Sequence, residues 1–101
     1  MVRLPRQLIV DTITIMEITY DSVKNATNIE RRGLSFDRVA ELDWSSAVIV
    51  EDTRKAYGER RFRVFGYIEE RLYAVVFTPR GTAVHVISFR KANSREVKHH
   101  G

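Results

Sequence analysis

The sequence predicts an α+β domain with the order β-α-α-β-β-β-β, in which helices pack on one face of an antiparallel β-sheet of four to five strands. Helical spacing of apolar residues gives way near residue 47 to the alternation that is typical of strands. The later strands follow one another on short connections, and short connections force neighbouring strands to pair antiparallel. At 101 residues the chain is long enough for one modest core, so we expect a single compact domain.

The first strand is predicted at residues 12–20, where apolar and polar side chains alternate with one break in phase near Met16. Asp21 or Ser22 can cap the helix that follows, which runs to Arg32 and stops at Gly33. The apolar side of this helix is made by Val23, Ala26 and Ile29.

A second helix is predicted directly afterwards, with Ser35 at its N-cap. Leu34 precedes the cap and can pack on Val39, as in a hydrophobic staple. We expect its buried face to consist of Phe36, Val39, Ala40 and Trp44.

Four further strands are predicted at residues 47–52, 60–68, 72–78 and 82–90. Residues 69–71 form a tight connection, and the "PRG" of residues 79–81 turns the chain into the last strand. The final segment, residues 91–101, can form a short third helix with Ser94 as its cap.

Strand alternation assigns side chains to the two faces of the sheet. It places Arg63, Phe65 and Tyr67 on the face opposite to that of Phe62, Val64, Gly66 and Ile68. In the last strand it groups Val84, Val86, Ser88 and Arg90 against His85, Ile87 and Phe89. Both faces carry apolar residues, so the pattern leaves open which one the helices cover.

Composition excludes several classes of function. The chain has no cysteine, which removes disulfide and thiolate chemistry, and it has no apolar run long enough to span a membrane. The three histidines have no carboxylate partner at ligand spacing, so we expect no metal site and no cofactor. His85 fits an ordinary strand residue. We expect a cytoplasmic protein.

Positive charge is concentrated in the second half of the chain. Residues 1–53 hold 6 Lys/Arg and 9 Asp/Glu, residues 54–96 hold 10 and 4, and Lys98 completes the net charge of +4. A basic patch on one part of a fold is typical of proteins that contact a polyanion, although it also fits an ordinary solvated surface.

The stretch "YGERRFRVFGY" places Glu59 and three arginines at the start of an apolar strand. RNA can be cleaved without a metal when the 2′-hydroxyl attacks the neighbouring phosphate, provided that the protein accepts its proton and neutralises the charge on phosphorus. Glu59 suits the first task, and the guanidinium groups of Arg61, Arg80 and Arg90 suit the second. The alternative is a surface ion pair of little energetic value.

Several motifs in order resemble the BrnT family, the toxins of bacterial type II toxin–antitoxin modules. They are "EITYDSVKNATNIERRGLSF", "YGERRFRVFGY", "RLYAVVFTPRG" and "VISFRKANSRE", and they cover roughly residues 16–97. The resemblance implies a RelE-like fold, RNA cleavage without a metal ion, growth arrest, and a BrnA-type antitoxin that also binds operator DNA.

The resemblance also implies which residues form the site. The catalytic set would be Glu59, Arg61, Arg80 and Arg90. Contact with RNA or antitoxin would fall to Lys24, Asn28, Arg31, Ser88 and Lys91.

The chain departs from the family pattern at several positions. Arg32 stands where the family often has histidine, His85 where arginine is common, and Phe89 where alanine is common. Residues 1–15 have no counterpart, so we expect an N-terminal extension followed by one toxin domain at residues 16–101.

Two other functions fit the same residues. The first is a non-catalytic basic module that binds nucleic acid or an acidic protein, and the second is a structural partner whose arginines meet acidic groups of an antitoxin.

Overall fold

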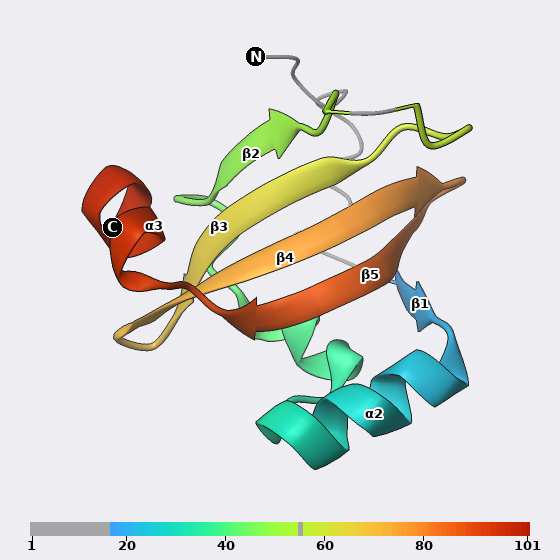
Figure 1. Ribbon diagram of the computed structural model, residues 1–101, viewed down its shortest axis with the longest axis horizontal. Coiled ribbons are helices and arrows are strands. Elements are labelled where there is room, and N and C mark those ends of the chain that lie inside the picture. Colours follow the sequence, from blue (N-terminus) through green and yellow to red (C-terminus); the bar gives the residue numbers. More distant parts are fainter. Residues whose placement is uncertain (1–16, 55) are drawn as a thin grey trace.

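The computed structural model describes residues 17–54 and 56–101 and confirms the α+β fold (Figure 1). Its elements are β1 (Glu17–Tyr20), α2 (Ser22–Arg32), the 3-10 helix η1 (Phe36–Glu41), β2 (Val48–Glu51), β3 (Phe62–Ile68), β4 (Arg71–Arg80), β5 (Ala83–Lys91) and α3 (Ser94–His100). The predicted extension and the predicted strand residues 12–16 lie outside the described residues.

The five strands form one sheet in the order β1-β5-β4-β3-β2. β2 to β5 pair antiparallel as expected, but β1 pairs parallel with β5, so the prediction of a wholly antiparallel sheet was wrong. No short connection joins β1 to β5, and the chain passes through both helices and three strands between them. The antiparallel constraint that short connections impose therefore does not apply to this edge.

The core lies between the sheet and η1. Phe36 and Val39 of η1 are buried in one cluster with Phe62, Val75 and Phe77 of the central strands. Trp44 joins the same cluster, and its indole Nε1 donates a hydrogen bond of 3.2 Å to the carbonyl of Val39.

Ala40 is exposed, contrary to the prediction. A 3-10 helix has three residues per turn, so the side chain after Val39 points away from the sheet.

The helix α2 packs through amide hydrogen bonds rather than through an apolar face. Val23, Ala26 and Ile29, predicted to form its packing side, are all exposed. Asn25 Oδ1 accepts from the Phe36 backbone N–H at 2.7 Å, and Asn28 Nδ2 donates to the carbonyls of Leu34 and Phe89 at 2.9 and 3.0 Å.

The ends of α2 are as predicted. Asp21 is the N-cap, and Gly33 ends the helix at φ 69°, a left-handed conformation that glycine adopts without steric cost.

A bulge at Ile87 reverses the predicted faces in the second half of β5. Val76 of β4 pairs with Ser88, whereas the next residue, Phe77, pairs with Val86, so Ile87 is an extra residue in β5. Phe89 consequently joins Val84 and Val86 in the core. Ser88 and Arg90 move to the opposite side of the sheet, which we call the open face.

The connections at the two ends of β4 and β5 also differ from the prediction. β4 continues through Pro79 and Arg80, so the turn is narrower than "PRG" and centres on Gly81 at φ 60°. At the other end Asn93, not Ser94, caps α3, and it exchanges hydrogen bonds with Glu96 in a capping box.

The helix α3 covers one end of the open face. The His100 ring stacks on Phe65 with a centroid distance of 4.1 Å.

No helix among the described residues is long and apolar enough to cross a membrane.

Candidate functional site

A cavity of about 170 Å³ lies where β4 ends and β5 begins. The turn at Gly81 brings Arg80 of β4 beside the first residues of β5, and the segment before β3 adds Glu59 and Arg61. Its charged and polar lining consists of Asp21, Lys24, Glu59, Arg61, Arg80 and His85. Three of the four predicted catalytic residues therefore meet in one place.

Glu59 stands between the two arginines of the cavity. Its carboxylate lies 3.8 Å from Arg61 Nη2 and 3.6 Å from Arg80 Nη2. These distances are longer than those of a tight charge-assisted hydrogen bond, so neither guanidinium is saturated by the carboxylate. The arrangement orients two cations toward the same space.

Arg61 has a donor without a partner. Its guanidinium carbon lies 4.1 Å from the centre of the Tyr57 ring, so the side chain is held by a cation–π contact. Its Nε is buried, and it makes no hydrogen bond to any described residue. A buried donor left unsatisfied costs about 1–3 kcal/mol.

Tyr57 is itself engaged, since its hydroxyl donates to Asp52 Oδ2 at 3.2 Å. Asp52 also accepts two hydrogen bonds from the Arg54 side chain, which hold the pKa of that buried carboxyl far below its usual range. The ring that supports Arg61 is thus anchored to the fold.

His85 is part of the cavity, although the sequence suggested only an ordinary strand residue. Its Nδ1 lies 2.8 Å from Thr19 Oγ1, across the parallel pairing of β1 and β5. Burial, followed by the positive charge of Arg80, lowers the pKa of His85 below its usual 6.5. The imidazole is therefore neutral at neutral pH.

The pairing of β4 with β5 indicates that His85 lies near Arg80. His85 pairs with Thr78, and Thr78 lies two residues before Arg80, so alternation places Arg80 and His85 on one face. If the turn had been predicted at Gly81 rather than at residues 79–81, the resulting strand pairing would have predicted that His85 lies beside Arg80.

Arg90 lies near the opposite end of β5 and does not line the cavity. It donates two hydrogen bonds to the Glu96 carboxylate of α3, at 2.7 and 2.8 Å. Arg90 lowers the pKa of Glu96 to about 2. Arg63 and Ser88 share a hollow of about 120 Å³ with this pair on the open face.

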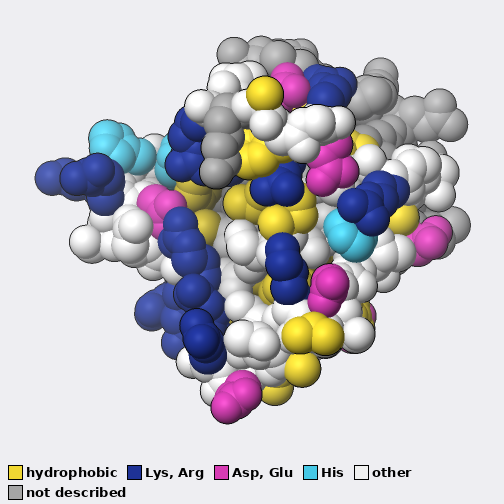
Figure 2. Space-filling view, turned by 45° about the vertical axis from the view of Figure 1, so that its right-hand side comes forward, with side chains coloured by type: hydrophobic (Ala, Val, Ile, Leu, Met, Phe, Trp, Pro, Cys, Tyr) yellow, Lys and Arg dark blue, Asp and Glu magenta, His cyan; other side chains and the backbone are white. Residues whose placement is uncertain are grey.

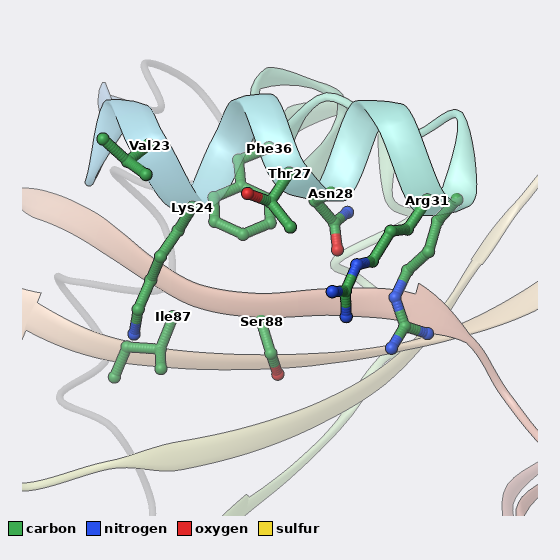
Figure 3. A pocket seen from close by; sticks show the side chains of 9 residues that line it. Val23, Lys24, Thr27, Asn28, Arg31, Phe36, Ile87 and Ser88 are labelled. Atoms are coloured by element: carbon green, nitrogen blue, oxygen red, sulfur yellow. The ribbon is translucent and has the colours of Figure 1, made fainter.

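A groove of about 270 Å³ separates α2 from β5 (Figure 3). Lys24 and Arg31 reach from the helix toward the strand, where Ser88 lies opposite them. Within the described parts of the chain, neither cation has an ion pair or a hydrogen-bond partner. Asn28 lines the same groove, but its amide Nδ2 is already used by Leu34 and Phe89.

The cavity and the groove adjoin each other, because Lys24 and Ile87 line both. Lys91, the last predicted contact residue, is exposed at the end of β5. Figure 2 shows Lys and Arg side chains in several separate groups on one side of the molecule, with acidic side chains beside some of them. Of the predicted contact residues, Lys24, Asn28 and Arg31 lie on α2, and Ser88 and Lys91 lie on β5.

In residues 17–54 and 56–101, no group of three or more His, Asp or Glu side chains could hold a metal ion.

A comparison with protein families matches residues 20–96 to a model described as "Ribonuclease toxin, BrnT, of type II toxin-antitoxin system". No curated protein matches the chain. The matched span includes every residue that lines the cavity.

Proposed function

The chain belongs to the BrnT family of ribonuclease toxins of type II toxin–antitoxin systems, and from this membership we propose that it is an endoribonuclease that cleaves RNA at the cavity of Glu59, Arg61 and Arg80 without a metal ion. The observation that carries the proposal is the pair of arginines that share one carboxylate at a single cavity. Such a site supplies what an in-line attack on phosphorus requires, namely fixed positive charge and fixed donors.

In this proposal Arg61 and Arg80 bind the non-bridging oxygens of the scissile phosphate and stabilise the extra charge that develops on them. Glu59 holds the two guanidinium groups in register, since it lies within 4 Å of both. No metal is required, because the arginines carry permanent charge.

We propose that the rest of the RNA follows the groove between α2 and β5. Lys24 and Arg31 reach into that groove without ion pairs among the described residues, and Ser88 offers a hydroxyl between them. Lys91 would contact a phosphate beyond the groove. Asn28 would contribute mainly by fixing α2 to β5, since its amide spans Leu34 and Phe89.

Arg90 receives a different role from the other predicted catalytic residues. Its two short hydrogen bonds to Glu96 leave less of its guanidinium open to a ligand, and it lies outside the cavity. We assign to Arg90 the anchoring of α3 on the sheet, beside the hollow that contains Arg63 and Ser88.

A type II system pairs its toxin with an antitoxin protein. We propose that the partner is a BrnA-type antitoxin, that it connects the complex to operator DNA, and that the free toxin arrests growth by cleaving RNA in the cytoplasm. Support comes from the family membership and from the concentration of basic groups around the cavity and groove, a surface that an acidic antitoxin would cover.

The proposal is tested by incubating the purified full chain with RNA in EDTA. Cleavage that is undiminished by the chelator supports a metal-independent endoribonuclease. Intact RNA after long incubation, together with binding that weakens steeply as salt rises, would instead favour a non-catalytic basic module.

A further inference from the structure

His85 lies where its side chain could take part in a reaction of RNA bound in the cavity. It lines the same cavity as Glu59, Arg61 and Arg80, so a phosphate held by the two arginines would lie beside its ring. Asp21, the N-cap of α2, and Lys24 of α2 complete the charged groups that face it.

The ring has a defined orientation. Thr19 Oγ1 lies 2.8 Å from His85 Nδ1, and the two residues are register partners in the parallel β1–β5 ladder. In the tautomer in which Nδ1–H donates to Thr19, Nε2 carries the lone pair. The described residues make no hydrogen bond to Nε2.

Glu59 is the less suitable proton acceptor. Its carboxylate is shared by two guanidinium groups, and protonation would release both ion pairs at the moment when the phosphate needs them. A neutral imidazole has no such conflict. Burial and the nearby Arg80 keep the pKa of His85 below its usual value, against the opposing charges of Glu59 and Asp21.

We propose that His85 is the general base of the RNA cleavage proposed above, on which this inference rests. His85 Nε2 takes the proton of the 2′-hydroxyl as the 2′-oxygen forms a bond to phosphorus. The bond from phosphorus to the 5′-oxygen breaks, and the electron pair leaves with that oxygen, which takes a proton from water. The hydroxide so formed takes the proton of the imidazolium, and the products are a 2′,3′-cyclic phosphate and a 5′-hydroxyl.

The test is the pH dependence of kcat/KM for one short RNA, with wild type and His85→Gln compared between about pH 5 and 8. Wild type should lose activity as the pH falls through a pKa below 6.5, because protonated His85 cannot accept a proton. His85→Gln should lose about 10²- to 10⁴-fold in kcat and should lack this acidic limb. Its affinity for a 2′-deoxy analogue that cannot be cleaved should match that of wild type, which also shows that the variant folds.

Two controls separate the possible failures. His99→Gln changes an exposed histidine of α3 and should leave the pH profile unchanged. Thr19→Val removes the partner of Nδ1 and should lower kcat while the affinity for the analogue stays the same. If wild type cleaves RNA and His85→Gln shows the same rate and pH profile, only the role of His85 is overturned. If wild type leaves RNA intact, the ribonuclease proposal is overturned as well.

Discussion

Arg80 Nη2 lies 3.6 Å from Glu59 Oε2, a contact that ties the last residue of β4 to the segment before β3. The same carboxylate lies 3.8 Å from Arg61, so one acidic group positions two cations. This three-residue arrangement forms the proposed phosphate site.

Glu59→Gln tests whether the acidic residue positions the arginines or takes the proton. The variant keeps the shape of Glu59 but loses its charge, so we expect kcat to fall about fivefold or less, since an exposed ion pair is worth up to about 1 kcal/mol. The affinity for RNA should not fall, because a negative charge has been removed from the site. Steady-state kinetics measure both.

Glu51→Gln is the matched control for this variant, because Glu51 pairs with Arg60 outside the cavity. Its kinetics should equal those of wild type. A loss of about 10⁴-fold in Glu59→Gln, accompanied by loss of the acidic limb, would make Glu59 the base instead.

The Arg90–Glu96 pair should contribute to stability. Arg90→Ala leaves a half-buried carboxylate without its partner and should lower the free energy of unfolding by about 1–3 kcal/mol. Arg95→Ala, which changes an exposed arginine on the same helix, should have little effect. Urea denaturation measures the difference, and equal stabilities would contradict the anchoring role of Arg90.

The Arg90–Glu96 pair also predicts that the free energy of unfolding falls at acidic pH. Glu96 has a pKa of about 2 in the folded protein and 4.5 ordinarily, so folding favours its ionised form. Its contribution is complete above its ordinary pKa and is lost as the pH falls toward about 2. Glu96→Gln should therefore show a smaller loss of stability over this range, and identical acid profiles would argue against the pair.

The groove between α2 and β5 should determine the salt dependence of RNA binding. Arg31→Ala should lower affinity and reduce the slope of log K against log salt by about 0.7 for each single-stranded phosphate contact removed. Arg38→Ala is the control, since Arg38 pairs with Glu41 on η1. Equal slopes for wild type and Arg31→Ala would exclude this path for the RNA.

Most of the strands were predictable because they are short runs rich in Val, Ile, Phe and Tyr that are separated by turn residues. The face of Arg90 was not, because one bulged residue, Ile87, reverses the alternation, and an apolar residue in an apolar strand does not reveal that it is extra. The packing of α2 was missed for a different reason. Asn25 and Asn28 attach the helix by amide hydrogen bonds, which hydrophobic periodicity does not detect.

The candidate site was predictable in part. Glu59 and Arg61 are close in sequence, and Arg80 joins them through the pairing of neighbouring strands. His85 was set aside because its partners, Thr19 and Arg80, come from separate elements, and only the register of the sheet brings them together.

Arg80→Ala and Arg60→Ala form a close pair for testing the proposed site. The two side chains are equally exposed, at 55% and 56%, and each is paired with a glutamate, but only Arg80 lines the cavity. Loss of a group that binds the transition-state phosphate costs about 10²- to 10³-fold in rate.

The most direct measurement is therefore the rate of RNA cleavage in EDTA by wild type and these two variants. We expect wild type and Arg60→Ala to cleave at similar rates and Arg80→Ala to be slower by about 10²-fold or more. Equal rates for Arg80→Ala and wild type would contradict the assignment of RNA cleavage to this cavity.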